Sequence, residues 1–262
     1  MKTHLTRILL AGIIFILLCC VGCKKDSGPA ANDTATLSGS GSDYFPVANN
    51  QTFIGKATGQ SISYDILGNV MQSQSINQQE VKGWMGGATT VAGMQAYPLF
   101  ALNTNGTTSS SSSSFIAQSN QGILGLLGST TIQTVTVIPA EISIGTKWIV
   151  NPSDPLHKQI SLQITDSKSS YTNSTGKTYS NVIKVNGVLS DSTSETWNGW
   201  ISYLIITVKK GSADLYFAKG IGLVDIQLNN YEEKEIYYYG STSGVPAFYN
   251  RTIRSGTLGK TN

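Results

Sequence analysis

Apolar and polar residues alternate with a period of two along most of this chain. In the clearest run, Ile160, Leu162 and Ile164 fall on one face of an extended segment, and the residues between them are polar. A similar run covers residues 132–138 and ends at a proline. Because a period of two is typical of a strand with one buried face, most of the chain is predicted to form β-structure.

The second half of the sequence predicts a series of strands joined by short turns. The predicted strands cover residues 160–165, 179–189, 200–208, 215–217, 221–228, 236–239 and 251–258, with turns at 168–177, 209–212 and 218–220. The strand at 200–208 is apolar enough to be buried on both faces. Only residues 77–85 allow a short helix. We therefore expect an all-β fold: a single antiparallel, strongly curved meander sheet, such as a half-barrel or open barrel, with at most one or two short helices. A β-sandwich is the alternative.

The first 22 residues have the pattern of a secretory signal peptide. Lys2 and Arg7 precede an almost unbroken apolar run at 8–21. This run is too short for a typical transmembrane helix. The Val-Gly-Cys sequence that follows resembles a bacterial lipobox. This resemblance implies that Cys23 is lipidated and becomes the first mature residue. The alternative is an ordinary secretory signal cut near the same position.

Residues 23–43 are predicted to form a flexible tether after the lipidated cysteine. The segment is rich in Gly, Ser, Asp and Lys, and Leu37 is its one sizeable aliphatic residue, so it cannot bury itself. We expect residues 44–262 to form a single β domain. A low-complexity loop with six consecutive serines is expected at 103–114.

Composition and charge narrow the functional classes. Basic and acidic residues nearly balance, at 18 and 15, and no basic cluster is visible, which argues against a nucleic-acid partner. All three cysteines lie at or before position 23, and His157 is the single histidine after it. Structural disulfides and metal sites built on cysteine and histidine are therefore not expected, and no cofactor is predicted.

Two segments carry a resemblance to known proteins. Residues 176–185 read GKTYSNVIKV and residues 216–224 read YFAKGIGLV. They resemble the second half of a group of bacterial outer-membrane lipoproteins of the Bacteroidetes type. That group also tends to open its domain with Tyr-Phe-Pro, found here at 44–46, and to carry Gly-x-x-Trp, found here at 145–148. The resemblance implies a curved antiparallel sheet or half-barrel and brings no catalytic residues with it.

Within the second of these segments, Gly220 and Gly222 have a simple physical interpretation. A tight turn between two strands requires positive φ or a close backbone approach, which glycine allows. We therefore interpret this pair as a structural turn rather than as a ligand loop.

Enzyme motifs are lacking. No Gly-x-Ser-x-Gly elbow is present in the mature chain. Glu195, Asp214, Asp225 and the acidic cluster at 232–235 could supply a carboxylate pair for glycoside hydrolysis, but such residues are more often surface charges. A non-enzymatic role is expected, with a glycan hydrolase as the third alternative.

Aromatic and aliphatic clusters are the candidates for binding. Trp197, Trp200 and Tyr203 lie close together in the sequence and could stack on sugars or line an apolar groove, although packing in the sheet is the simpler reading. The segment at 122–128 places Leu124 and Leu126 among glycines. We interpret it as a surface lid over the concave face of the sheet rather than as a strand. Contact with a membrane or a partner, and a place in the core, are the alternatives.

Together these patterns predict a protein anchored to the outer membrane through Cys23, facing the periplasm or the cell surface. We expect it to be a binding or assembly module, with an apolar small molecule or a glycan in the concave face of its sheet. A structural partner of another envelope protein is the second reading.

Overall fold

The fold of the chain is given by a computed structural model. The structure describes residues 37, 39–65, 67–102, 108–128, 131–150, 160–198, 202–239 and 246–262. The predicted signal peptide, Cys23 and most of the predicted tether lie outside the described residues. None of the described helices is long and apolar enough to cross a membrane.

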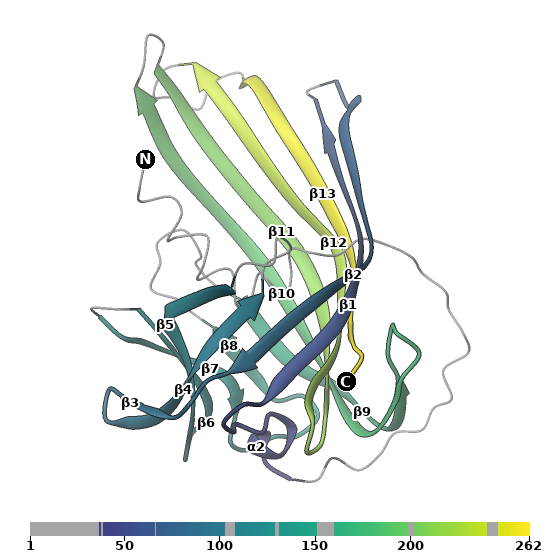
Figure 1. Ribbon diagram of the computed structural model, residues 1–262. Coiled ribbons are helices and arrows are strands. Elements are labelled where there is room, and N and C mark those ends of the chain that lie inside the picture. The colour runs from purple at the N-terminus through teal and green to yellow at the C-terminus, as the bar shows by residue number, and fades with distance from the viewer. Residues whose placement is uncertain are drawn as a thin grey trace.

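Antiparallel strands make up almost all of the described chain (Figure 1). Within the described residues, one short helix, α2 (Gly41–Tyr44), precedes them. The strands are β1 (Thr52–Tyr64), β2 (Val70–Met85), β3 (Thr89–Val91), β4 (Met94–Leu102), β5 (Thr108–Ser119), β6 (Gly122–Leu127), β7 (Gln133–Pro139), β8 (Lys147–Val150), β9 (Ile160–Thr172), β10 (Thr178–Asn198), β11 (Ser202–Ala218), β12 (Gly222–Tyr239) and β13 (Pro246–Lys260).

These strands form one sheet in the order β7-β6-β5-β4-β2-β1-β13-β12-β11-β10-β9-β8, with β3 paired to β4. The first strand pairs with the last, from Gly55 opposite Lys260 to Tyr64 opposite Arg251. No ladder joins β7 to β8 within the described residues, so the sheet curves without closing into a regular barrel. The predicted single, strongly curved antiparallel sheet is therefore confirmed.

The sheet has two parts (Figure 1). The lower body holds α2, β3 to β9 and the near ends of the long strands. The outer halves of β1, β2 and β10 to β13 extend beyond it, and we call them the outer ribbon. Register shifts occur between Lys210 and Ser212 in the β11–β12 pairing and between Leu228 and Tyr231 in the β12–β13 pairing. Such bulges bend and twist the bulged strands, and here they lie at the same level of neighbouring strands.

The core lies in the lower body, where the two ends of the sheet approach one another. Ile138 from β7 packs in one buried cluster with Ile164 from β9 and Ile183 from β10. Tyr44 of α2 joins this cluster, and the rings of Phe45 and Phe217 lie 6.1 Å apart. Tyr44 and Phe45, which precede β1, therefore belong to the core.

Four local expectations are wrong. Residues 108–114, expected in the loop, begin β5: residues 108–110 pair with β4, and Ser114 pairs with Leu127 of β6. Residues 77–85, allowed as a short helix, belong to β2 and pair with β1. Residues 209–212, expected as a turn, continue β11 between β10 and β12. Residues 41–43 of the expected tether belong to α2, whose first residue donates its backbone N–H to the carbonyl of Ala140.

Candidate functional site

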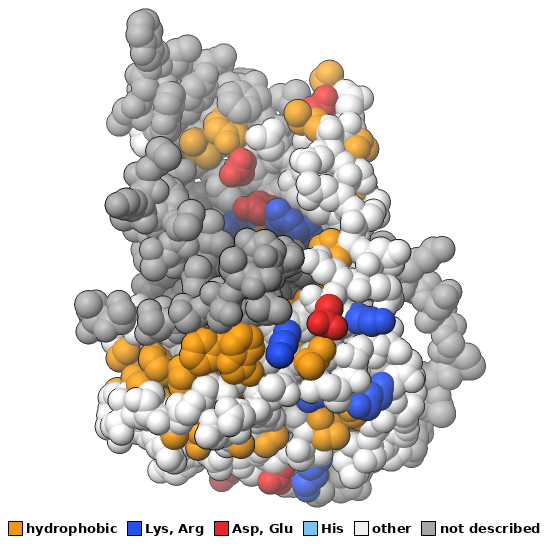
Figure 2. Space-filling view, viewed as in Figure 1, with side chains coloured by type: hydrophobic (Ala, Val, Ile, Leu, Met, Phe, Trp, Pro, Cys, Tyr) orange, Lys and Arg blue, Asp and Glu red, His pale blue; other side chains and the backbone are white. Residues whose placement is uncertain are grey.

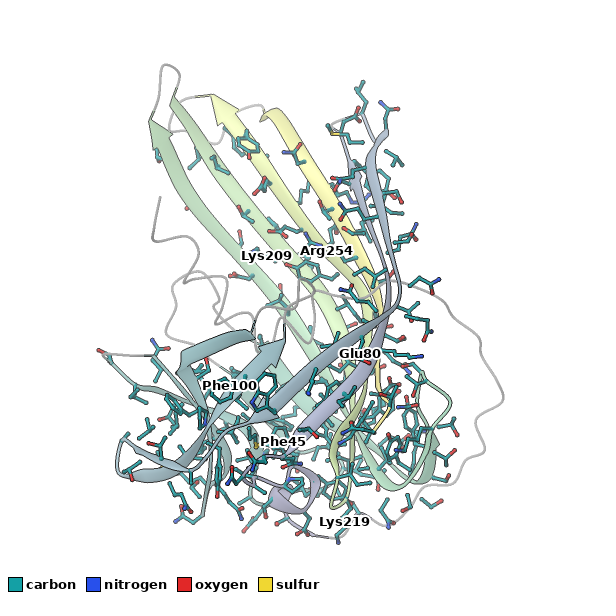
Figure 3. The ribbon with its side chains drawn as sticks, viewed as in Figure 1. Phe45, Glu80, Phe100, Lys209, Lys219 and Arg254 are labelled. Carbon is teal, nitrogen blue, oxygen red and sulfur yellow. The ribbon has the colours of Figure 1, made fainter. Side chains whose placement is uncertain are left out.

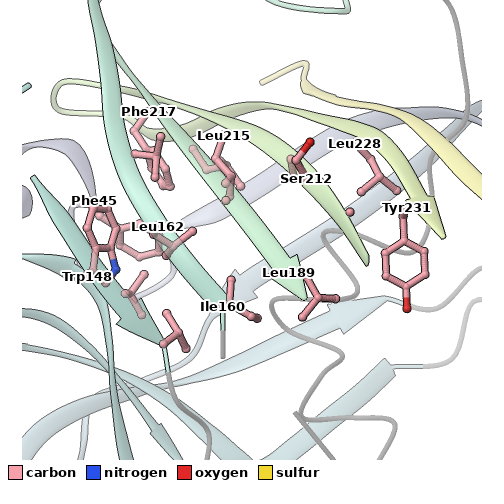
Figure 4. A pocket seen from close by; sticks show the side chains of 17 residues that line it. Phe45, Trp148, Ile160, Leu162, Leu189, Ser212, Leu215, Phe217, Leu228 and Tyr231 are labelled. Atoms are coloured by element: carbon pink, nitrogen blue, oxygen red, sulfur yellow. The ribbon is translucent and has the colours of Figure 1, made fainter. Parts of the chain in front are cut away.

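An apolar cavity of about 100 Å³ lies on the concave face of the sheet (Figure 4). Strands β8 to β12 form its floor, and β7 and the segment after α2 contribute to its wall. The lining residues are Phe45, Val137, Trp148, Val150, Ile160, Leu162, Val185, Gly187, Leu189, Gly211, Ser212, Ala213, Leu215, Phe217, Leu223, Leu228 and Tyr231. Nearly all of them are apolar, so the cavity suits a hydrocarbon group.

The alternation of the strands explains this lining. On β10, Val185, Gly187 and Leu189 are two residues apart and therefore share the concave face. On β11, Ala213 and Leu215 do the same. Gly187 and Ala213 stand opposite each other in the β10–β11 ladder and carry little or no side chain. The Leu162 side chain reaches over Gly187, where an added Cβ atom would come within 3.0 Å of Leu162 Cδ2.

At the outer end of the cavity, Tyr231 lies across Gly211. A Cβ atom on Gly211 would come within 2.9 Å of the Tyr231 Cα atom and 3.2 Å of its Cβ atom. The glycine therefore permits the bulged part of β12 to approach β11. The Arg254 guanidinium lies 5.6 Å from the centre of the Tyr231 ring, so the apolar lining ends at a charged region.

A row of charged residues crosses the same face just beyond the cavity. Asp191 on β10 stands directly opposite Lys209 on β11, which stands opposite Glu233 on β12. The Lys209 Nζ atom lies 3.5 Å from Glu233 Oε1, and an Arg254 Nη atom lies 3.1 Å from Glu233 Oε2. Figure 3 shows Lys209 and Arg254 in the outer ribbon, and Figure 2 shows acidic and basic side chains side by side in its hollow. We call Asp191, Lys209, Glu233 and Arg254 the charged row.

Asp191 differs from the other members of the row. Its side chain is 5% exposed, and its Oδ1 atom is buried without a hydrogen-bond partner. A carboxylate removed from water is expensive unless it meets a cation or hydrogen-bond donors. The indole Nε1 atom of Trp148, in the cavity wall, is also buried without a partner. The site thus offers one acceptor and one donor beside an apolar space.

The volume of the cavity limits what it can hold. Drug-sized ligands need roughly 300–1,000 Å³, so about 100 Å³ is enough for only part of such a molecule. A water molecule takes about 30 Å³ of liquid volume. The cavity can therefore enclose a small group of non-hydrogen atoms, such as the end of an aliphatic chain.

A second polar cluster lies on the opposite face of the sheet, around Asp225. The Tyr171 hydroxyl donates to Asp225 Oδ2 at 2.5 Å, and the Ser174 hydroxyl donates to Oδ1 at 2.6 Å. Gln227 donates to the same carboxylate at 3.3 Å. Burial raises the pKa of Asp225, although these hydrogen bonds oppose the change. Asp225 is 0% exposed, so this cluster fastens the turn after β9 to β12 and leaves no access for a substrate.

Among the described residues, no group of three or more His, Cys, Asp or Glu side chains is arranged to hold a metal ion. Of the other carboxylates considered for hydrolysis, Asp214 is paired with Lys184 at 3.0 Å. Glu232 accepts a hydrogen bond from Arg251 at 2.5 Å. These pairings favour structural roles for both side chains.

Of the predicted binding residues, Leu124 and Leu126 have described side chains, and they do not line the cavity. Trp197 and Tyr203 are directly opposite each other at the outer end of the β10–β11 ladder, but their side chains are not described, and Trp200 lies outside the described residues. Leu124 and Leu126 are 3% and 0% exposed within β6. The expected surface lid at 122–128 is therefore wrong, because β5 and β7 pair with this segment on both sides and bury it.

The turn residues lie as the turn interpretation requires. Gly220 and Gly222 have φ of +75° and +97° at the connection between β11 and β12. Sequence reasoning did not single out Gly187, Asp191, Gly211 or Tyr231. The one available signal was the spacing of Val185, Leu189 and Asp191, which places an acid at the end of an apolar face.

The fold and the cavity define an all-β protein with a small apolar site on the concave face of one curved sheet. No protein-family model matches the chain. The search of curated proteins also finds no match. Among solved structures, a putative lipoprotein from Parabacteroides distasonis ATCC 8503 is similar with a TM-score of 0.34 and 11% identity, over 87% of this chain and all of that chain. A likeness of this size carries no functional inference.

Proposed function

We propose that this protein is a non-enzymatic binding module of the cell envelope that takes the apolar part of a small ligand into the concave cavity. The observation that carries this proposal is an almost wholly apolar space that opens beside a charged row. Binding sites commonly combine an apolar lining with a few polar groups that orient the ligand.

The proposal includes a lipid anchor at Cys23 on the outer membrane. Its support is the sequence: a charged start, a short apolar run and a cysteine in the lipobox position. Several acyl chains on one cysteine hold a protein firmly, since each buried CH₂ contributes about 0.8 kcal/mol. In cells, Cys23→Ala should give an uncleaved or a soluble product. Membrane partitioning and a mature size equal to those of the wild type would contradict the anchor without bearing on the cavity.

The cavity is tested with small probes that need no knowledge of the natural ligand. Xenon and n-hexanol should shift the methyl NMR signals of Val150, Leu189 and Leu228, because apolar cavities of comparable size accept such probes. In Ala213→Leu the larger side chain should fill the floor and abolish these shifts. Circular dichroism should show that this variant remains folded.

Val188→Leu is the matched control. It adds volume on the neighbouring strand β10, but Val188 is 46% exposed and is not among the cavity-lining residues. Its probe-induced shifts should equal those of the wild type. Absence of shifts in the wild type, or equal shifts in Ala213→Leu, would contradict the proposed function.

A further inference from the structure

We propose that Asp191 binds the ammonium group of a ligand whose aliphatic part fills the cavity, so that the site selects short-chain amines. This inference rests on the proposed function, since it assigns a chemical class to the ligand of the same cavity. Asp191 is 95% buried, from its exposure of 5%, and its Oδ1 atom has no hydrogen-bond partner. A buried carboxylate without a partner is the group that a bound cation would satisfy.

The geometry connects this carboxylate to the cavity. Leu189 lines the cavity, and Asp191 follows it two residues later on the same face of β10. At about 3.3 Å per residue, the two side chains are separated by roughly 7 Å along the strand. A short unbranched chain spans this distance with its hydrocarbon end beside Leu189 and its head at Asp191.

The cations of the charged row are engaged elsewhere. Lys209 stands opposite Asp191 in the ladder, but its Nζ atom pairs with Glu233 at 3.5 Å. Arg254 also pairs with Glu233, at 3.1 Å. Among the described side chains, neither cation forms an ion pair or hydrogen bond with Asp191, so its buried Oδ1 atom still lacks a donor.

The local charge also favours a cation over the alternatives. Glu235 lies two residues beyond Glu233 on β12 and accepts a hydrogen bond from Tyr237 at 3.0 Å. Together with Glu235, the charged row therefore holds three carboxylates and two cations. An anionic head group would meet a buried negative charge, and a hydroxyl would donate one hydrogen bond but leave the charge uncompensated. An ammonium group supplies both donors and charge.

The test compares three unbranched ligands of equal chain length at neutral pH: n-hexylamine, n-hexanol and hexanoate. Binding is measured by isothermal titration calorimetry and by methyl NMR shifts at Leu189 and Leu228. We expect the amine to bind roughly tenfold or more tightly than the alcohol, since hydrogen bonds to charged groups contribute about 1.5–3 kcal/mol. Hexanoate should bind more weakly than hexanol.

Asp191→Asn keeps the shape of the side chain and removes its charge. It should reduce the affinity for hexylamine to that for hexanol while leaving hexanol binding unchanged. It should also raise the thermal midpoint of the free protein, because it removes an unpaired buried charge. Asp214→Asn is the matched control: it makes the same change on the opposite face of β11, where Asp214 pairs with Lys184, and it should preserve the preference for the amine.

The outcomes separate this inference from the proposed function. If none of the three ligands shifts the cavity signals, the proposed function itself is contradicted. If hexanol binds as well as hexylamine, or if Asp191→Asn retains the preference for the amine, the proposed ammonium site is wrong. The proposed binding of an apolar group in the cavity is not contradicted by either result. Equal loss of preference in Asp214→Asn would show that the effect is general electrostatics rather than a contact with Asp191.

Discussion

The Tyr171 hydroxyl donates a 2.5 Å hydrogen bond to the carboxylate of Asp225, fifty-four positions further along the chain. The pKa of Tyr171 is raised, first by burial and then by the charge of Asp225. Ser174 and Gln227 also donate to this carboxylate. The cluster therefore links β9, its following turn and β12 through one acidic side chain.

Asp225→Asn should destabilise the protein by about 1–3 kcal/mol, because the new amide group faces hydrogen-bond donors. The pH dependence gives a second readout. Burial raises the pKa of Asp225 above 3.8, so the folded state binds the proton more tightly, and this contribution is greatest at low pH. Urea midpoints measured from below pH 3.8 to neutrality should show the wild type losing stability relative to Asp225→Asn as the pH rises. A constant or growing advantage of the wild type would contradict the raised pKa.

Gly211→Ala should destabilise the protein by about 1–3 kcal/mol, as overpacking does, because the added Cβ would come within 2.9 Å of the Tyr231 Cα atom. Thermal and urea unfolding measure the effect. Gly87→Ala is the control, since a Cβ there meets nothing within 4 Å and no positive φ is recorded for it. Equal midpoints for the two variants would show that the close approach of Tyr231 is not required.

Leu126→Ala should cost about 2–5 kcal/mol, the range for a fully buried leucine. Leu126 is 0% exposed and packs with Ala96, Ala117 and Leu124. Leu67→Ala removes the same atoms from a side chain that is 82% exposed, and its effect should stay within about 0.5 kcal/mol. Chemical denaturation of both variants measures these changes in the free energy of unfolding. A small effect of Leu126→Ala would contradict the burial of residues 122–128 and favour a position on the surface.

Gly220→Val should destabilise the turn between β11 and β12, because φ at this position is +75°. A left-handed conformation costs a residue with a Cβ roughly 1–2 kcal/mol, and a β-branched residue more, whereas asparagine adopts it more readily. A Cβ at Gly220 meets nothing within 4 Å, so any loss reflects backbone strain alone. Gly220→Asn should therefore unfold at a higher temperature than Gly220→Val. The reverse order would contradict the conformational explanation.

Patterns within single strands were predictable from the sequence. Ile160 and Ile164 are buried and the intervening Ser161 is exposed, as the alternation predicts. The ends of the strands were less predictable, because they depend on neighbours. The sequence at 209–212 has the composition of a turn, yet it lies between β10 and β12, and their ladders keep it extended. The run of serines also continues a strand, with Ser109 and Ser110 paired to β4 and Ser114 paired to β6.

The candidate site could not be predicted from the residue pattern of any single strand. The cavity lining brings Gly187 and Ala213 side by side on neighbouring strands, which depends on register. Asp191 reads as an ordinary polar residue near the end of a strand, and its burial depends on the curvature of the whole sheet. The surface lid was wrongly predicted at Leu124 and Leu126 for a related reason. The glycines around them are typical of a loop, but two neighbouring strands hold this segment extended in the core.

The pairing of β1 with β13 also bears on the order of folding. Gly55 faces Lys260 across more than two hundred intervening positions, and ten successive residues of β1 depend on this ladder. Contacts so distant in sequence form slowly, because a long loop must close before they contribute. β1 therefore leaves the ribosome long before its partner β13. Until β13 is synthesised, β1 and β12 each lack a neighbour on one side, so the sheet stays incomplete while all the strands between them are made.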